Sequence, residues 1–332
     1  MTRGLCDDPA FAGSEFVLVD IDPRRLREAE AAARRTIAER GAALAVRATV
    51  DRRRAFDGCD CVISSCEQSR YVFWLKDLAI PERFGVRQVT AENGGPGGQI
   101  HGLRNITLFM GVCRDMAALC PGAWLMNFTN PVSFIATYVA RFTPIRSVGL
   151  CHQVHGSMGV VAEMLGFEPG GLEAVTGGVN HFNWLLDIRK KGSQTSFMPE
   201  FLKRVRASTY WKKNRRNIPR HRLTLDILET FGVYPVGYDD HIIEYIPFLY
   251  EPSEWARRGI RSNREDLLVA LGKKPRPADH GRYPFPRDSR HPYYREIPTA
   301  VLAALDRRKP TYFDAINIPN RGCCPSIFPA VS

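Results

Sequence analysis

The chain has 332 residues, of which 44% are hydrophobic and 10% are aromatic, so it can bury a large core and is not a disordered polypeptide. Its apolar runs are far shorter than the roughly 20 residues that a membrane helix needs. The formal charge of +11 would fit a nucleic-acid binder, but most of the basic residues are scattered along the chain. We therefore expect neither a membrane nor a nucleic acid as a partner.

Basic side chains are concentrated in one stretch, residues 203–222, where they surround Tyr210 and Trp211. Surface charge runs are usually solvated loops, and this is the first interpretation of the stretch. The alternative is a contact with an anion or an acidic sugar.

The nine cysteines are an odd number, and no charged start followed by an apolar segment marks the chain for secretion. A framework of paired disulfides is therefore not expected. The sequence indicates a cytoplasmic protein with reduced thiols.

Apolar runs and helical segments alternate along the first half of the chain. We predict strands at residues 16–22, 43–50, 59–65, 124–128 and 147–150, and helices at residues 24–40, 72–78 and 113–119. This rhythm is typical of a Rossmann-like, doubly wound parallel sheet, which we assign to residues 1–150. Residues 151–332, with a strand pair near 178–188, are expected to form an α+β domain.

Polar residues follow several of the predicted strands, at the edge where open α/β sheets bind ligands. Asp20 ends the first strand, where a carboxylate can bind a dinucleotide ribose or cap a turn. Asn130 precedes a proline and is either fixed at the sheet edge or part of a turn. The segment 94–98, GGPGG, is a weak signal that reads as a flexible turn beside a ligand.

Cys151 and His152 follow another strand in GLCHQVHG, and His181 lies thirty residues beyond Cys151 in GGVNHFNW. One thiolate and one imidazole suit manganese, iron, cobalt or zinc when further positions stay open to substrate. An isolated Cys and an isolated His are more often structural, so spacing alone supports this pair weakly.

These motifs occur together and in a familiar order. The segments VLVDID, ENGGPGG with LRNI, NFTNP, GLCH, GVNH, GYDDHIIEY and NIPNRG resemble glycoside hydrolase family 4 over nearly the whole chain. The GLCH segment, in which a His follows the cysteine, is similar to the corresponding segment in the α-galactosidase and α-uronidase branch of this family. The resemblance implies a second domain of the lactate and malate dehydrogenase type, a sugar as the small-molecule partner, and a homodimer or homotetramer.

The resemblance also implies a site, which can be carried over residue by residue. Cys151 and His181 would bind the catalytic manganese or another divalent metal, and Asn130 and Asn180 would contact the sugar. Asp20 would contact the ribose of NAD, with Ser64 as a further cofactor contact. His152 would be the candidate acid beside the scissile bond.

The base is less clear, because some members use a Tyr, whereas the aligned segment here holds Asp240 and His241 with Tyr245 nearby. We favour Asp240 over His241, and a solvated loop is the alternative. Arg104 either binds a substrate carboxylate or phosphate, or pairs with a local acid.

Members of the family depart from the usual pair of carboxylates. The resemblance implies that NAD⁺ oxidises the sugar at C3, a base removes the C2 proton, and the C1 leaving group departs by elimination. Water then adds back and the hydride returns. The metal would bind the C2 and C3 oxygens as a Lewis acid and stabilise the enediolate.

The resemblance breaks at both ends. Only 19 residues precede Asp20, and they contain no G-x-G-x-x-G loop, whereas relatives begin with a strand and such a loop. The far end stops at Ser332, where relatives continue. Either the gene model is truncated or the gene is a decayed copy. In both cases we expect exposed apolar strand edges, low stability and a loss of activity.

Two rival functions stay open. A lactate- or malate-type NAD-dependent dehydrogenase shares the sheet and the Asn position but needs no metal, and a pairing of His181 with an acid would favour it. An inactive, truncated sensor of sugars or nucleotides is the second rival, and catalysis would separate it from a hydrolase.

Overall fold

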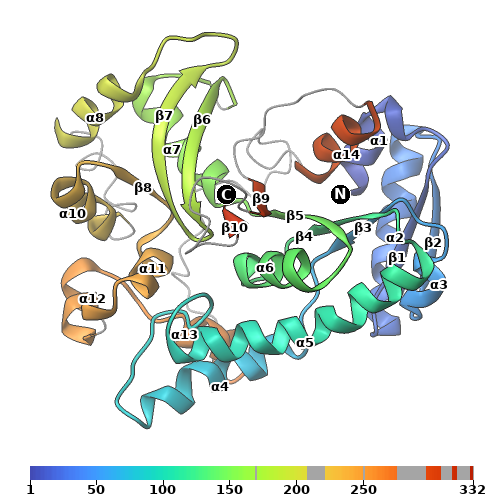
Figure 1. Ribbon diagram of the computed structural model, residues 1–332, viewed down its shortest axis with the longest axis horizontal. Coiled ribbons are helices and arrows are strands. Elements are labelled where there is room, and N and C mark those ends of the chain that lie inside the picture. Colours follow the sequence, from blue (N-terminus) through green and yellow to red (C-terminus); the bar gives the residue numbers. More distant parts are fainter. Residues whose placement is uncertain are drawn as a thin grey trace.

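The structure is a computed structural model, and it describes residues 1–168, 170–207, 221–249, 251–274, 297–307, 316–319 and 330–331. In Figure 1 a mixed sheet lies in the centre, a pair of strands lies on its right and an antiparallel sheet stands on its left. Most of the basic stretch at 203–222 lies outside the described residues, so both interpretations of it stay predictions.

Strands and helices alternate along the first half, as the sequence predicts. The elements are α1 (Thr2–Asp7), η1 (Pro9–Phe11), β1 (Glu15–Val19), α2 (Pro23–Arg40), β2 (Ala45–Thr49), α3 (Arg52–Phe56), β3 (Cys61–Ser64), α4 (Arg70–Glu82), α5 (Gly95–Leu119), β4 (Trp124–Asn127), α6 (Val132–Phe142), β5 (Arg146–Leu150) and α7 (Gln153–Leu165). The strands β3, β4 and β5 are parallel neighbours, and β1 runs parallel to β2. The Rossmann-like fold class is confirmed.

The strands of this half form two sheets instead of one continuous sheet. Among the described strands, β1 pairs with β2 alone, while β3 is the outer strand of the order β10-β9-β5-β4-β3. In a doubly wound sheet of the order 3-2-1-4-5-6, another parallel strand lies between strands in these two positions. Val19, at the end of β1, is 41% exposed, while the exposed strand edges expected from the sequence stay a prediction.

Helix α5 corrects two predictions. The sequence predicts a short helix at 113–119 and a flexible turn at 94–98, but α5 runs unbroken for 25 residues from Gly95. Pro96 suits the first turn of a helix, where its missing N–H is not needed. A Cβ on Gly97 would lie 2.4 Å from the carbonyl oxygen of Asp77, so this glycine permits close packing.

The second half of the chain contains an antiparallel sheet surrounded by short helices. Its elements are β6 (Leu172–Val179), β7 (Phe182–Lys190), α8 (Met198–Ala207), α10 (Arg222–Phe231), β8 (Tyr234–Val236), α11 (Asp239–Ile242), η3 (Ile243–Tyr245), η4 (Pro247–Leu249), α12 (Pro252–Arg258), α13 (Arg264–Ala270), α14 (Ile297–Arg307), β9 (Ile316–Pro319) and β10 (Ala330–Val331). The predicted strand pair is the β6–β7 hairpin.

Helices pack on both faces of the central sheet and enclose its core. On one face, Phe109 and Met116 of α5 and Ile135 of α6 pack against Leu125 of β4. On the other face, Val301 of α14 packs against Met126 and its neighbours. Strand β9 runs antiparallel to β5. The late strands therefore extend the first sheet, and the division at residue 150 stays a prediction.

Candidate metal and sugar site

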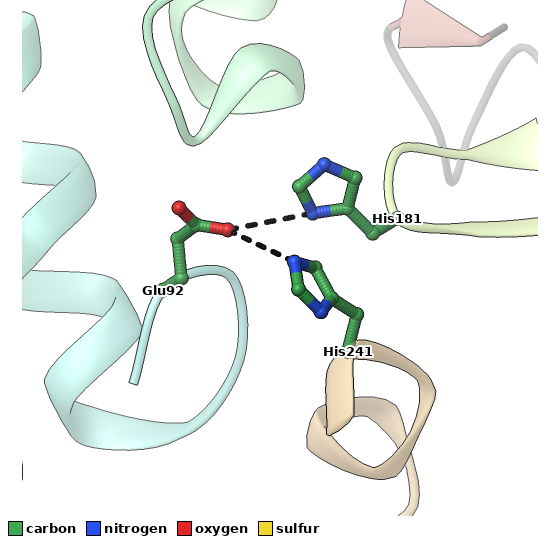
Figure 2. A group of neighbouring side chains, drawn as sticks. All are labelled: Glu92, His181 and His241. Carbon is green, nitrogen blue, oxygen red and sulfur yellow. Dashed lines mark ion pairs between the residues drawn. The ribbon is translucent and has the colours of Figure 1, made fainter. Parts of the chain in front are cut away.

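Glu92 lies at the centre of a largely buried cluster. Its carboxylate is contributed by the loop before α5, and His181 and His241 approach it from the β6–β7 turn and from α11 (Figure 2). Oε2 of Glu92 lies 3.5 Å from Nδ1 of His181 and 3.6 Å from Nε2 of His241. Three ligand atoms from these residues lie within 4.8 Å of one another, a spacing that suits a metal ion.

Cys151 approaches the other side of the His181 ring. Its sulfur lies 3.2 Å from Nε2 of His181, and it also accepts a hydrogen bond from the backbone N–H of Gln153 at 3.4 Å. Strand β5 ends at Leu150, so Cys151 projects at the carboxyl edge of the parallel sheet. The structure thus brings together the two residues for which the sequence predicts metal binding.

Buried amide oxygens surround the same place. In the described part of the chain, Oδ1 of Asn93, Asn130 and Asn180 is buried and has no hydrogen-bond partner. Asn130 donates from Nδ2 to Oε1 of Glu92 at 2.9 Å, which places its side chain beside the cluster. Buried acceptors of this kind usually have partners, so these oxygens suit a bound ligand that donates hydrogen bonds.

Asp240 and His241 form a pair in which only the histidine faces the cluster. Nδ1 of His241 lies 2.9 Å from Oδ1 of Asp240, and the opposite nitrogen faces Glu92. The Asp240 side chain is 46% exposed, whereas that of His241 is 28% exposed. The geometry favours His241 over Asp240 as the group that reaches a substrate. Asp240, which the sequence analysis favours as the base, therefore has no geometric support.

The ionisation of the cluster follows from burial and neighbouring charge. Burial lowers the pKa of His181 to about 3, so its imidazole is neutral. Burial alone would lower the pKa of His241. The negative charges of Asp240, Glu92 and Glu244 have the larger effect, and the pKa is raised to about 9. For Glu92, burial raises the pKa, and the surrounding His and Arg side chains reverse the direction and lower it.

His152 is exposed and follows Cys151 directly in the chain. It precedes α7, its ring is stacked on Phe128 with 5.6 Å between the centroids, and partial burial of the ring lowers its pKa. The structure places it next to Cys151 in the chain but gives it no contact with Glu92. Its role as an acid stays a prediction.

The predicted cofactor contacts lie at the carboxyl ends of their strands. Asp20 follows β1, and its Oδ1 accepts the backbone N–H of Asp22 at 2.8 Å, which is the turn-capping alternative. Ser64 ends β3 and donates to Oδ1 of Asn127 at 2.9 Å. Both positions agree with the sequence analysis, while binding of NAD by these residues stays a prediction.

Arg104 has a protein partner. Its two terminal nitrogens donate to the two oxygens of Asp77, one of them at 3.1 Å, and the Arg104 side chain is only 16% exposed. The structure therefore shows the second alternative for Arg104, a pairing with a local acid. Binding of a substrate by Arg104 stays a prediction.

Sequence reasoning missed Glu92 as a site residue. The segment ENGGPGG was noted, but only its glycines were weighed, although the acid at its start is the group on which the histidines converge. Glu244 was missed as well. Its carboxylate accepts backbone hydrogen bonds from the Glu92 loop, and no local sequence pattern announces a contact across 150 residues.

Comparison with known proteins decides the family. The family described as Family 4 glycosyl hydrolase matches residues 1–167, and the Family 4 glycosyl hydrolase C-terminal domain matches residues 176–329. The chain belongs to family 4 of the glycosyl hydrolases. This family 4 chain does contain the pairing of a His with an acid that we expected of a dehydrogenase, between His181 and Glu92, yet the same ring also faces Cys151.

Curated relatives of this family 4 chain are glycosidases. It is 35% identical over 286 residues to an α-glucosidase of Erwinia rhapontici, covering 76% of this chain and 62% of the relative. It is 30% identical over 268 residues to an α-galactosidase of Bacillus subtilis (strain 168), covering 80% of this chain and 59% of the relative. The family 4 chain thus spans about 60% of the length of these relatives.

The fold is shared with solved structures of the family. A 6-phospho-α-glucosidase from gut microorganisms, in complex with NAD and Mn²⁺, superposes with a TM-score of 0.73 at 20% identity. The match covers 100% of this chain and 78% of the other. Within the residues that the structure describes, no helix combines the length and the apolar character needed to cross a membrane.

Proposed function

We propose that this family 4 chain cleaves α-glycosides, of the α-galactoside or α-uronide kind, in a reaction that uses NAD and a divalent metal such as manganese. The observation that carries the proposal is the opposed pair of Cys151 Sγ and His181 Nε2, 3.2 Å apart at the carboxyl edge of the sheet. The names of the relatives, an α-glucosidase and an α-galactosidase, support the substrate class.

The donor set fits a divalent metal. With bond lengths of about 2.3 Å to sulfur and about 2.0 Å to nitrogen, two ligands of one ion lie roughly 3.1 Å apart at a right angle and roughly 3.5 Å apart at a tetrahedral angle. The observed 3.2 Å falls between these values. Two protein ligands leave positions open for sugar oxygens, and the buried Asn130 and Asn180 oxygens lie nearby.

The other nitrogen of His181 supports this assignment. Nδ1 lies 3.5 Å from a carboxylate oxygen of Glu92, which can accept its proton. Metal-binding histidines commonly donate the N–H of the nitrogen that does not bind the metal to such an acceptor. We propose that the metal lies on the Cys151 side of the ring, and that Glu92 with His241 faces the sugar.

The NAD half of the site fits in part. Asp20 stands at the end of a parallel strand, where a carboxylate suits a ribose, and Ser64 stands at the end of another. We propose both as cofactor contacts on the strength of the family. When bound, NAD⁺ would take up the hydride from the sugar, and the metal would polarise the sugar oxygens as a Lewis acid.

The side chains of the cluster would bind the sugar and move its protons. The free amide oxygens of Asn130 and Asn180 would accept hydrogen bonds from sugar hydroxyls. Because its pKa is raised, His241 would face the sugar as a cation oriented by Asp240, and the ionised Glu92 beside it would accept the proton that is removed from C2. The exposed His152, next to Cys151 in the chain, would donate a proton to the leaving group. We further propose a cytoplasmic homo-oligomer, as the family resemblance implies.

Hydrolysis in heavy water tests the proposal. The chain, and a version extended at its amino end by a strand and a G-x-G-x-x-G loop, are incubated with NAD⁺, Mn²⁺, a thiol reductant and nitrophenyl α-galactoside, α-glucoside or α-galacturonide. Removal of the C2 proton exchanges it with solvent, so we expect a product sugar with deuterium at C2. Release of nitrophenol should require both NAD⁺ and Mn²⁺.

Three results would count against the proposal. Turnover without deuterium at C2 would indicate the ordinary mechanism with two carboxylates. Net accumulation of NADH with a 2-hydroxy acid would indicate the dehydrogenase rival. No turnover of any α-glycoside by the extended version would exclude the hydrolase.

A further inference from the structure

Two adjacent residues of η3, Glu244 and Tyr245, contact the backbone on opposite sides of the cluster. Glu244 is 4% exposed and contacts the loop that contributes Glu92. Tyr245 contacts the turn that contributes His181. Because the two residues are neighbours in one short 3-10 turn, the two contacts are linked through the backbone of that turn.

Glu244 binds a row of successive backbone N–H groups. Its Oε1 accepts from Thr90 at 3.2 Å and from Ala91, and its Oε2 accepts from Glu92 at 3.1 Å, Asn93 at 2.9 Å and Gly94 at 3.4 Å. Successive N–H groups that turn inward form a concave anion site. Here the anion is a side chain of the protein itself.

The shape of this loop depends on the carboxylate. Ala91 has a φ of 53°, in the left-handed region that non-glycine residues rarely adopt. Such a conformation persists only where surrounding contacts hold it. Without Glu244, buried N–H groups would also lose their acceptor, which is costly in a protein interior. The position of the Glu92 side chain therefore follows from Glu244.

Tyr245 satisfies both polar groups of one peptide unit. Its hydroxyl donates to the carbonyl oxygen of Asn180 at 2.8 Å and accepts from the N–H of His181 at 3.1 Å. Its ring is stacked on Phe182 with 5.5 Å between the centroids. Because this hydroxyl is engaged as donor and as acceptor, Tyr245 is placed to hold the turn and not to act as the base.

We propose that Glu244 and Tyr245 are positioning residues that together hold the Glu92 carboxylate against the His181 ring. The proposal rests on the proposed function in naming His181 as a metal ligand. Apolar neighbours stiffen the connection, since Ile242, Ile243 and Ile246 around η3 pack against Val89 at the start of the Glu92 loop. The site is thus assembled from two distant segments through one short turn.

The test uses Glu244→Gln and Tyr245→Phe in the 332-residue chain. Glutamine keeps one acceptor oxygen and turns an NH₂ group toward the N–H row, so Glu92 should leave its place. Phenylalanine keeps the stacked ring and removes only the hydroxyl. Glu229→Gln and Tyr71→Phe, at exposed positions on α10 and α4, are the matched controls.

Cobalt binding and crystal structures give readouts that need no turnover. In Tyr245→Phe we expect the affinity for Co²⁺, read from the thiolate-to-cobalt absorption band, to fall 10- to 100-fold, as for other partners that orient metal ligands. In Glu244→Gln, which displaces the Glu92 carboxylate from behind His181, we expect a smaller fall in Co²⁺ affinity, and a crystal structure in which Glu92 has moved away from His181 by more than about 1 Å. The two controls should match the wild-type chain.

The proposal is wrong if Tyr245→Phe binds Co²⁺ like the wild type and its His181 turn is unmoved. It is also wrong if a folded Glu244→Gln keeps the 3.5 Å separation of Glu92 and His181. If Glu244→Gln does not fold, or if the wild type binds no Co²⁺, the crystal structure of Tyr245→Phe decides: a moved His181 turn supports the proposal, and an unmoved turn contradicts it. An absence of glycosidase activity with these shifts present would contradict the proposed function alone.

Discussion

The sulfur of Cys151 lies 3.2 Å from Nε2 of His181, although thirty residues separate them in the chain. One residue is placed by the end of a parallel strand and the other by the tip of an antiparallel hairpin. Their contact therefore depends on how the central sheet and the β6–β7 hairpin pack together, and it defines the side of the His181 ring on which a metal would bind.

Replacing Glu92 by Gln should disable the cluster without removing the metal pair. The amide keeps the size of the side chain but loses the charge that faces His181 and His241. We expect activity of the extended version to fall about 100- to 10,000-fold, the range typical of lost acid–base groups, with Co²⁺ affinity changed much less. Loss of Co²⁺ binding would instead place the metal among Glu92, His181 and His241.

Replacing Arg104 by Met should lower stability and spare substrate binding. Arg104 donates to both oxygens of Asp77, and the change leaves that acid, which is 5% exposed, without its partner. Breaking a buried pair in this way costs about 3 kcal/mol of unfolding free energy. Denaturant unfolding measures the loss, and a double-mutant cycle with Asp77→Asn should show strong coupling. A KM raised tenfold at unchanged stability would restore Arg104 as a substrate contact.

The pair of Asp115 with Arg52 and Arg53 should make stability depend on pH. Burial raises the pKa of Asp115, but hydrogen bonds from both arginines outweigh it, so the pKa in the folded chain lies below its ordinary value. Because the pKa of Asp115 is lower in the folded than in the unfolded chain, its ionised form stabilises the folded protein at pH values above the unfolded pKa near 4. This stabilisation is lost as the pH falls through the pKa of the folded chain.

The matching variant is Asp115→Asn. Because both arginines are partly exposed, we expect it to lose only about 1 kcal/mol of unfolding free energy at pH 7. The difference from the wild type should shrink when urea unfolding is repeated at pH 3. If the difference in unfolding free energy between the wild type and Asp115→Asn grew toward low pH, the predicted direction of the pKa shift of Asp115 would be wrong.

Replacing Gly97 by Ala should disturb the start of α5. The added Cβ would lie 2.4 Å from the carbonyl oxygen of Asp77 and 2.7 Å from Cβ of Ala91. Overpacking of this kind costs about 1–3 kcal/mol, and it presses on the loop that holds Glu92. Gly122→Ala, with open space around its Cβ, is the control and should be neutral. Equal melting temperatures for the two variants would contradict the close-packing explanation.

The parallel half of the fold could be predicted because its information is local. The apolar runs that became β3 and β4 end in a polar residue, and those that became β1 and β5 are followed by Asp20 and Cys151. Such endings predict a ligand edge. The start of α5 could not be predicted in this way, because Gly95–Gly98 read as a turn until the packing against Asp77 is known.

The site was predictable only where motifs carried it. Cys151 and His181 came from the family resemblance, since spacing alone supported them weakly. Glu92 and Glu244 were missed because their importance lies in contacts across some 90 to 150 residues. The sequence favoured Asp240 as the base. It could not show that the His241 ring lies between Asp240 and the cluster, which only the structure reveals.

A titration with Co²⁺ of the wild-type chain and of Cys151→Ser tests the central claim most directly. If Cys151 and His181 hold the metal, the wild type should develop a thiolate-to-cobalt absorption band that saturates at one ion per chain. Cys151→Ser should lack the band and bind Co²⁺ at least about 100-fold more weakly, with a melting temperature close to the wild type. An unchanged Co²⁺ affinity in Cys151→Ser would contradict the account.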